Sequence, residues 1–562
     1  MLSKRLSYLV LALLAAFALA LVACGDDDDD GDGGGDGTAA ATSEPTGDRI
    51  EDDETPLVIA RAMDTLNGDP HRAFCDTCQI YISAVYQTLV GLDYTDNATL
   101  IPKVATDWSA SDDLATWTFN LNPDAVFADG TPLTSADVKW SLERLANLKG
   151  SPSFFMEGVE SIDTPDDHQI VVHMAGPDAA FPAKMNAPYT AIVNKALAEA
   201  NGAQGGADAE TTDAAEQWFL ANSAGSGPYV LESFAQGDSL RLVRNENYWG
   251  PSPKAAIKTV IIQEVADAVT QRQLLEAGDA DIAMQIDPDT ARGIENADVT
   301  IESVPSLNFV YVGFVVGTEG AVGSELDLNQ NVRQAIQAAI DYDGMLEVLL
   351  GGDGRKQATA IPNGFLGTAN LPLPERDLDK ARELLTAGGY PDGFELDAPY
   401  WNTNVYGVDF NLMMQKVQSD LAEIGVRLNL QPLEASVVFE SLANNQVPFT
   451  AIYYAPDHPD TVQYPQYFAM IEGSRWSSRA GGTQGPIVSQ TQQDLYDQAL
   501  QTDDLAERER LYDELGREMI ADAYLIPLAN PNLILAYRSN LQGMHYSGCC
   551  NVELVELYRT TE

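Results

Sequence analysis

The stretch that decides the fold covers residues 126–139 and reads VFADGTPLTSADVK. The pair Asp129-Gly130 is typical of a tight turn. Thr134 or Ser135 is a suitable helix N-cap, and Asp137 then lies at the positive end of the helix dipole. This stretch therefore predicts a turn followed by a helix that begins near residue 134.

Short strands and amphipathic helices alternate on both sides of this stretch. Trp117, Phe119 and Leu121 alternate with polar residues, which predicts a strand with one buried face. Apolar residues recur at helical spacing within 332–340, 413–424 and 511–519, and glycine-rich turns such as GGYPDG at 388–393 separate the units. This mixed order predicts an α/β fold.

The charge balance excludes one large class of partner. The 562 residues include 84 Asp and Glu against 32 Lys and Arg, a net charge of −52. Nucleic-acid binding needs clusters of Lys and Arg, and the sequence has none. The acidity extends into the folded body, where it indicates either solubility or a preference for cationic ligands. With 45% hydrophobic residues the chain can bury a sizeable core, and its length predicts about three domains.

The first 23 residues predict an export signal. Lys4 and Arg5 precede an apolar run over 8–20, and the junction Leu-Val-Ala-Cys ends at Cys24. This junction resembles a bacterial lipobox, which implies cleavage before Cys24 and lipid attachment to its thiol. An uncleaved membrane anchor is the alternative, because about 20 apolar residues also suit a membrane-spanning helix. We expect an extracytoplasmic protein that is lipid-anchored to the cell membrane.

Residues 24–54 predict an acidic tether. Positions 25–54 hold 13 Asp or Glu, seven Gly and a single basic residue. Such a segment buries too little apolar surface to offset the entropy of ordering it. We therefore expect the folded body to begin at Thr55.

Motifs for catalysis are missing from the sequence. It has no Gly-x-Ser-x-Gly elbow, phosphate-binding loop, His-Glu-x-x-His or dinucleotide-binding glycine motif. The five histidines, His458 among them, are isolated, and His168 and His173 lie in or beside a predicted strand, which favours surface or packing roles. We predict no enzyme activity, no cofactor and no metal site. An exported hydrolase or a structural surface lipoprotein remains the alternative.

Several segments together resemble one family, the extracytoplasmic solute-binding proteins of family 5, which are dipeptide, oligopeptide and nickel receptors of ABC importers. The resemblance covers almost all of 55–562 and is strongest at residues 126–139. The other matching segments are YQTLVGL at 86–92, PKVATDW at 102–108, WTF at 117–119, GSGPY at 225–229, RNENYWG at 244–250, and residues 332–341, 381–394 and 424–426.

The resemblance implies a two-lobed periplasmic-binding-protein fold of type II, cluster C. Lobe one comprises 55–308 plus 529–562, with an extra subdomain, and lobe two comprises 309–528. The chain is expected to cross between the lobes near 306–309 and 527–531. A peptide or peptide-like solute is held between the lobes, and lobe closure forms the surface that the ABC permease reads. A non-peptide amine, sugar or metal chelate is an alternative solute, and we expect a monomer.

The resemblance also implies which residues contact the solute. In the peptide-binding branches an acidic residue, just after a strand of lobe two, pairs with the free amino group, and the matching residue here is Asp457. A solvated turn aspartate is the alternative interpretation. Tyr453, Tyr454 and Trp401 are candidate aromatic walls, although each also suits the core of lobe two. Thr77 in lobe one is a further candidate.

One departure from the family concerns the carboxylate of the solute. The dipeptide-binding branch has an arginine at the position of Asn404, and no basic residue occurs from Leu384 to Gln415. A longer peptide, or an amine or sugar without a carboxylate, therefore suits this chain better than a dipeptide. The small number of histidines disfavours nickel.

Four cysteines remain after Cys24. Cys75 and Cys78 can close a local bridge, whereas a bridge between the neighbours Cys549 and Cys550 is disfavoured by ring strain. The resemblance places Cys75 and the C-terminal tail in the same lobe. We therefore hypothesise at least one bridge from Cys75 or Cys78 to Cys549 or Cys550.

Overall fold

The computed structural model describes residues 47–63, 67–250, 254–284, 286–314, 326–443, 446–470, 488–548 and 552–561. The predicted signal peptide, Cys24, the first part of the predicted tether, Cys549 and Cys550 lie outside these ranges. Residues 46–562 form one compact unit. In the described ranges, no helix has the length and apolar composition that a membrane crossing requires.

The largest sheet has ten strands within the described residues, and its main path runs β19-β13-β20-β11-β1-β10-β9-β8, with β12 and β14 also paired to β20. β1 is parallel to both β10 and β11, whereas β20 is antiparallel to its partners. The bounds are β1 Leu57–Arg61, β8 Tyr229–Ala235, β9 Ser239–Arg244, β10 Thr259–Glu264, β11 Ile282–Ala283, β12 Val299–Pro305, β13 Phe309–Phe314, β14 Gly354–Arg355, β19 Phe449–Tyr454 and β20 Leu525–Arg538.

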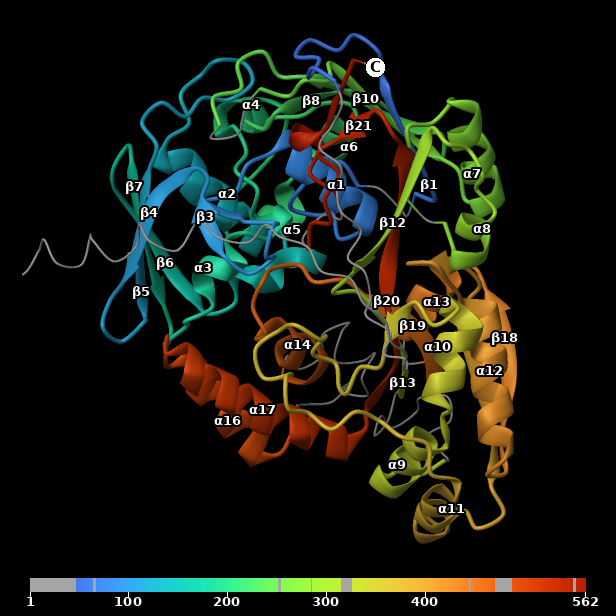
Figure 1. Cartoon of the computed structure of the whole chain (residues 1–562). Helices are drawn as coiled ribbons and strands as arrows, with labels where there is room; N and C mark the ends of the chain where they lie inside the picture. The colour runs from blue at the N-terminus through green and yellow to red at the C-terminus, as the bar shows by residue number, and fades with distance from the viewer. Residues whose placement is uncertain are drawn as a thin grey trace, which may run out of the picture. The chain divides into compact units, whose positions relative to one another are not determined.

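β20 connects the two predicted lobes (Figure 1). Residues 525–529 of β20 pair with β13, and residues 532–538 pair with β12. The chain passes from β12 to β13 through residues 306–308. At this point the side-chain Nδ2 of Asn530 donates to the carbonyl oxygens of Ser306 (3.0 Å) and Asn308 (2.6 Å). One side chain therefore joins the two connections.

A four-stranded antiparallel sheet, in the order β4-β5-β7-β6, lies in the predicted extra subdomain of lobe one. The alternation predicted at Trp117, Phe119 and Leu121 is confirmed in β5, where these three side chains are buried. The predicted helix start is also confirmed, since Thr134 is the N-cap of α2 and Asp137 Oδ2 accepts from the Thr134 N–H (3.0 Å). The bounds are β4 Ala105–Ala110, β5 Thr116–Leu121, β6 Val159–Asp166, β7 Gln169–Met174 and α2 Ser135–Asn147.

Shorter elements complete lobe one. They are α1 Asp76–Val85, η1 Ser151–Met156, α3 Phe181–Lys184, η2 Pro188–Thr190, α4 Lys195–Ala200, α5 Ala209–Thr212, α6 Glu216–Phe219, α7 Ala268–Ala277, α8 Pro288–Arg292 and η4 Leu554–Glu556, with the strand pairs β2 Val90–Leu92 with β3 Leu100–Pro102 and β21 Leu541–Gln542 with β22 Tyr558–Arg559.

Lobe two contains the helices that the sequence spacing predicts at 332–340, 413–424 and 511–519. They form α9, α12 and α17, although α12 ends at Ala422, before Ile424. β15 and β18 form a parallel pair, and β16 and β17 form a hairpin. The bounds are α9 Gln330–Ala339, α10 Tyr342–Leu350, α11 Leu378–Ala387, β15 Phe394–Trp401, β16 Asn404–Val405, β17 Val408–Asp409, α12 Phe410–Ala422, β18 Val426–Leu433, α13 Ala435–Ala443, α14 Gln463–Pro465, η3 Gln466–Met470, α16 Gln490–Leu500 and α17 Leu505–Asp522.

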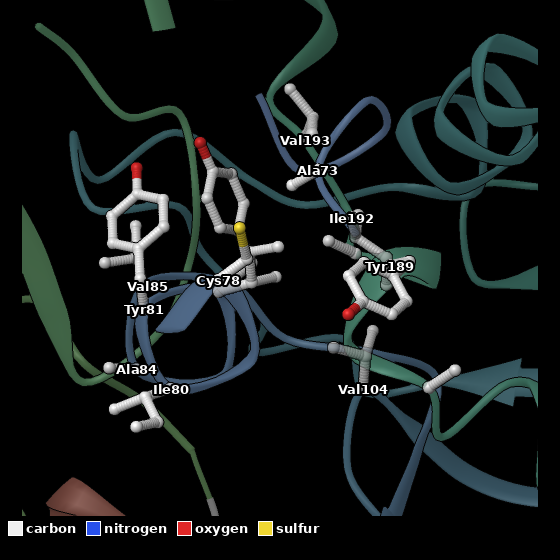
Figure 2. Packing of buried hydrophobic residues seen from close by; sticks show 14 of the residues in the cluster. Ala73, Cys78, Ile80, Tyr81, Ala84, Val85, Val104, Tyr189, Ile192 and Val193 are labelled. Carbon is white, nitrogen blue, oxygen red and sulfur yellow. The ribbon is translucent and has the colours of Figure 1, made fainter. Parts of the chain in front are cut away.

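The buried hydrophobic residues fall into several clusters. One large cluster draws its buried members from 57–284 and 533–557, and a second draws them from 310–529. Figure 2 shows part of the first cluster, with Cys78 and Tyr81 of α1 near Tyr189 and Val193. A third cluster lies within lobe two, yet Phe74 and Phe154 of lobe one pack against it. The lobes thus have separate cores and a shared apolar contact.

The folded body begins before Thr55, which corrects the predicted tether. The Ile50 N–H donates to the carbonyl oxygen of Arg559 (2.9 Å), and the Arg559 guanidinium forms an ion pair with buried Asp53 (2.6 Å). Acidic composition alone predicts a solvated segment, but here a basic residue from the far end of the chain neutralises the acid. Residues 47–54 therefore belong to the fold.

Candidate functional site

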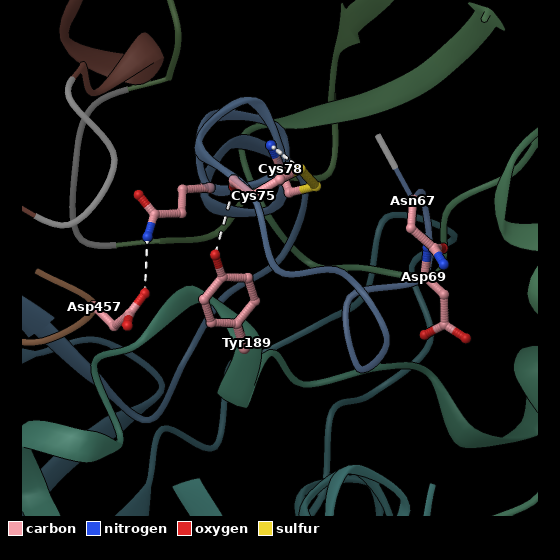
Figure 3. Close-up of a disulfide and its surroundings, with 7 residues drawn as sticks. Asn67, Asp69, Cys75, Cys78, Tyr189 and Asp457 are labelled. Carbon is pink, nitrogen blue, oxygen red and sulfur yellow. Dashed lines mark hydrogen bonds between the residues drawn. A yellow bond between two sulfur atoms is a disulfide. The ribbon is translucent and has the colours of Figure 1, made fainter. Parts of the chain in front are cut away.

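The first turn of α1 carries two polar side chains of lobe one, Asp76 and Gln79, that form hydrogen bonds with lobe two. Cys75 is its N-cap in extended conformation, and its Sγ accepts from the Cys78 N–H (3.2 Å). A disulfide joins Cys75 to Cys78 (Figure 3). The turn is thus closed by a covalent bridge as well as by helical hydrogen bonds.

This disulfide shows that the hypothesised bridge to the C-terminal tail is wrong. Each cysteine forms one disulfide, and Cys75 and Cys78 are bonded to each other. The helix start brings their Cα atoms within 5.0 Å, inside the range that a disulfide spans. Cys549 and Cys550 lie outside the described residues.

Two hydrogen bonds connect this turn to lobe two. Gln79 Nε2 donates to Asp457 Oδ1 (3.1 Å), and the Tyr406 hydroxyl donates to Asp76 Oδ2 (3.0 Å). The dashed line that ends on Asp457 in Figure 3 is the first of these bonds. Two carboxyl groups, Asp76 from lobe one and Asp457 from lobe two, therefore lie at the contact between the lobes.

Asp457 is buried among neutral partners. Its side chain accepts from the Tyr454 hydroxyl (2.9 Å) as well as from Gln79, and its backbone N–H donates to Gln463 Oε1 (2.9 Å). Burial, and then the charge of Asp76, raise the pKa of Asp457 to about 8, while its hydrogen bonds act in the opposite direction. Among the described residues no cationic side chain lowers this pKa, so we expect the carboxyl to hold a proton at neutral pH.

Aromatic side chains of lobe two surround this pair of acids. The Tyr453 ring lies 6.0 Å from Trp401 and 5.5 Å from Tyr406, whose hydroxyl reaches Asp76. Tyr454 packs against Tyr464 at 5.7 Å and is fully buried. The structure therefore places Tyr453 and Trp401 beside the contact, whereas Tyr454 lies in the core with only its hydroxyl on Asp457.

Asn404 begins the β16–β17 hairpin, whose two-residue turn is Tyr406-Gly407. Both turn residues have positive φ, +54° for Tyr406 and +78° for Gly407, as a type I′ turn requires. A tyrosine with positive φ is uncommon, and this turn directs its hydroxyl to Asp76. Asn404 Oδ1 is buried and has no hydrogen-bond partner in the described residues.

Two further residues remain to be described, the candidate Thr77 and the neighbour of Asp457, His458. Thr77 is fully buried in the first turn of α1. His458 follows Asp457, and its ring lies 6.1 Å from Phe155 of lobe one. Burial lowers the pKa of His458 to about 3, and among the described residues neither ring nitrogen has a hydrogen-bond partner. The buried ring of His458 therefore has two polar atoms unsatisfied among the described residues.

Sequence analysis missed Asp76, Gln79 and Tyr406. Each lies close in the sequence to a predicted candidate, Thr77 or Asn404. This proximity was the only feature of the sequence that could have indicated a place at the site. Their roles depend on contacts between residues more than 300 positions apart, which local patterns do not reveal. The part of the chain that the structure describes has no group of three or more His, Cys, Asp or Glu suited to a metal ion.

Two α/β lobes joined by two chain connections, with polar side chains of both lobes meeting at their contact, define a type II periplasmic binding protein. The sequence profile of the bacterial extracellular solute-binding proteins, family 5 (middle), matches residues 99–473. The chain belongs to this family, as the sequence motifs indicate. Its function is to bind a solute outside the cytoplasm.

Curated relatives match most of the chain. The probable D,D-dipeptide-binding periplasmic protein DdpA of Escherichia coli K12 is 27% identical over 502 residues, which cover 87% of this chain and 91% of that protein. The glutathione-binding protein GsiB of Pectobacterium atrosepticum is 26% identical over 497 residues, with the same coverage of each chain. The similarity therefore extends over both lobes.

A solved structure confirms the fold. The periplasmic binding protein DppA of Helicobacter pylori, in complex with the peptide STSA, superposes with a TM-score of 0.78 at 22% identity. The match covers 91% of this chain and 99% of that one. The predicted α/β, two-lobed fold class is confirmed.

Proposed function

We propose that this protein captures a peptide or peptide-like solute that carries a positively charged amino group, holds it between the two lobes and delivers it to an ABC permease. The observation that carries the proposal is the environment of Asp457. This carboxyl is buried at the contact between the lobes, and its hydrogen-bond partners are the neutral side chains of Gln79 and Tyr454. The relatives named for D,D-dipeptide and glutathione binding support the solute class.

The chemistry of the site suits an ammonium group. A solute ammonium can replace the proton that Asp457 holds in the free protein, so that a buried acid becomes a buried ion pair. Such a pair is strong because little water competes for either charge, and it rejects solutes that lack the charge. Asp76 adds a second negative charge on the side of lobe one.

The same contacts couple solute binding to lobe closure. Gln79 of lobe one and Tyr454 of lobe two both donate to Asp457. A solute amine bound to this carboxylate is therefore positioned by both lobes at once. Because the solute binds best where both partners are present, it favours the closed arrangement.

Asn404 distinguishes this site from that of a dipeptide receptor. A guanidinium fork binds a carboxylate through two parallel hydrogen bonds, and an amide side chain cannot do so. The buried, unpartnered Oδ1 of Asn404 can instead accept an N–H of the solute. We therefore favour a peptide longer than two residues, or an amine without a nearby carboxylate.

Mass spectrometry of solute released from the purified protein tests the proposal. We expect compounds with a primary amine, chiefly short peptides. Recovery of only anionic or uncharged sugars, from protein whose Asp457 is intact, would contradict it.

Affinity should depend on pH in a defined direction. Because Asp457 of the free protein keeps its proton up to about pH 8, binding an ammonium below that pH requires proton release. We expect affinity for the tripeptide Ala-Ala-Ala to fall about tenfold from pH 7 to pH 6. Calorimetry at both values checks this, and Asp457→Asn should show no such fall. A pH-independent affinity of the unsubstituted protein would contradict the role of Asp457.

We also propose that the mature chain begins at Cys24 and carries lipid, as the Leu-Val-Ala-Cys junction after an apolar run supports. Cys24→Ala should move most of the protein from the membrane fraction to the soluble fraction. Fractionation with mass measurement of the N-terminus is the test. A variant that stays on the membrane with all of 1–23 present would favour the uncleaved anchor, and unchanged processing would exclude a lipid on Cys24.

A further inference from the structure

The Cys75–Cys78 disulfide lies next to both side chains that reach lobe two from α1. Asp76, inside the loop that the bridge closes, accepts from Tyr406, and Gln79, the residue after the bridge, donates to Asp457. Figure 3 shows the bridge at the start of α1, close to the bond that ends on Asp457.

Cys75 is held by several contacts besides the bridge. Its Sγ accepts from the Cys78 N–H, and its carbonyl oxygen accepts from the Gln79 N–H (3.0 Å) and from the Tyr189 hydroxyl (3.5 Å). Cys78 is fully buried in the core of lobe one. The disulfide therefore ties a partly exposed helix N-cap to a core residue one turn later, and the first turn of α1 cannot fray while the bridge is intact.

We propose that this disulfide positions Asp76 and Gln79 for the solute, so that its reduction weakens solute binding. The proposal rests on the proposed function of Asp457. The covalent bridge holds the backbone from which Gln79 reaches across to lobe two. Without it, the turn depends on a thiol as N-cap, and sulfur is a weak hydrogen-bond acceptor.

Reduction requires an external dithiol, for which dithiothreitol is the probe. One of its thiolates attacks the Sγ of Cys75, the less buried of the two cysteines, and Cys78 leaves as a thiolate that takes up a proton. The second thiol of the reagent then displaces Cys75. The protein gains two thiols, and the reagent becomes a cyclic disulfide, so two electrons and two protons pass to the protein.

The test compares oxidised and reduced full-length protein by calorimetry with Ala-Ala-Ala and by amide hydrogen exchange. After reduction, confirmed by thiol counting, we expect about tenfold weaker affinity and faster exchange of the Cys78 and Gln79 amides. Equal affinity and equal exchange in the two states would overturn the proposal.

Two double variants separate the bridge from the cap. Cys75→Ser with Cys78→Ala keeps an oxygen that can accept from the residue 78 N–H, and Cys75→Ala with Cys78→Ala removes bridge and acceptor. Both should bind Ala-Ala-Ala less tightly than the oxidised protein, the second more weakly than the first, and dithiothreitol should change neither. If either variant binds as tightly as oxidised protein, the bridge has no positioning role.

A disulfide that positions Gln79 can be distinguished from a purely structural one by whether the effect of its reduction depends on Asp457. If the disulfide acts through Gln79, reduction should cost less affinity in Asp457→Asn than in the unsubstituted protein. Equal costs in both would show a general loss of order and would contradict positioning. Failure of oxidised protein to bind Ala-Ala-Ala contradicts the proposed function instead, and amide exchange then still decides whether the bridge orders this turn.

Discussion

Replacing Asp457 by asparagine is expected to weaken the binding of Ala-Ala-Ala by about 2–5 kcal/mol, roughly thirtyfold to several thousandfold. Asparagine keeps the shape of the side chain and still accepts one hydrogen bond, but it cannot carry the charge that an ammonium needs. The buried position makes the loss large, because Asp457 is only 3% exposed and little water can replace the missing carboxylate.

Calorimetry at pH 8 measures this effect, and Asp379→Asn is the matched control. Asp379 also belongs to lobe two, but its side chain is 96% exposed and pairs with Arg382 on the surface. The control should bind like the unsubstituted protein. A change of less than about threefold in Asp457→Asn would place Asp457 outside the site.

The same substitution should stabilise the ligand-free protein. The folded-state pKa of Asp457, about 8, lies above the ordinary value of 3.8, so the folded state holds this proton more tightly than the unfolded state. Its contribution to stability is therefore greatest below about pH 4 and is lost as pH rises towards 8. Asparagine does not titrate, so the Asp457→Asn variant does not lose stability in this way as pH rises. The melting temperature of the variant should exceed that of the unsubstituted protein at pH 8 but not at pH 4.

Replacing Arg144 by methionine is expected to cost about 3–5 kcal/mol of folding stability. This guanidinium is fully buried in lobe one, where its NH1 and NH2 donate to Asp69 (2.8 and 2.6 Å) and its Nε donates to Asp213 (2.9 Å). Methionine fills a similar volume but leaves the two buried carboxylates without this partner. His71 Nδ1 lies 3.2 Å from NH1, and burial, then the charge of Arg144, lower the pKa of His71 to about 4 in the unsubstituted protein.

Chemical denaturation of Arg144→Met, with two further variants, measures this cost. Arg510→Met removes an equally charged side chain whose ion pairs with Glu507 and Glu514 are about half exposed. Its cost in stability should be much smaller, because exposed ion pairs contribute little. Arg144→Lys should be intermediate, since a lysine keeps the charge but cannot form the bidentate pair. A cost for Arg144→Met no greater than that of Arg510→Met would contradict the account of this buried network.

Local patterns were sufficient for much of the fold. Alternation predicted the buried face of β5, and the Thr-Ser-Ala-Asp stretch predicted the start of α2, because both depend on neighbouring residues. The start of the folded body was not predictable in this way. The ion pair of Asp53 with Arg559 joins positions 506 residues apart, so composition alone assigned the segment to a solvated tether.

The candidate site shows the same limit. Asp457 was a candidate because its position resembles that of the family's acidic residue just after a strand of lobe two, and its burial agrees with a role in binding. Asp76 and Gln79 were missed because each contacts a residue far away in the sequence. Asp76 contacts Tyr406, 330 positions later, and Gln79 contacts Asp457, 378 positions later. The cysteine pairing was predicted wrongly for a related reason. The long-range bridge was inferred because the resemblance places Cys75 and the C-terminal tail in one lobe, whereas the helix start brings Cys75 and Cys78 together.

Calorimetric titration of the oxidised protein at pH 8 with Ala-Ala-Ala and with its N-acetylated form tests the central claim most directly. The two peptides differ only at the amino group, which acetylation makes neutral. The account predicts that the free tripeptide binds and that acetylation weakens binding by at least about thirtyfold, with no comparable difference in Asp457→Asn. Equal affinity for the two peptides would contradict it.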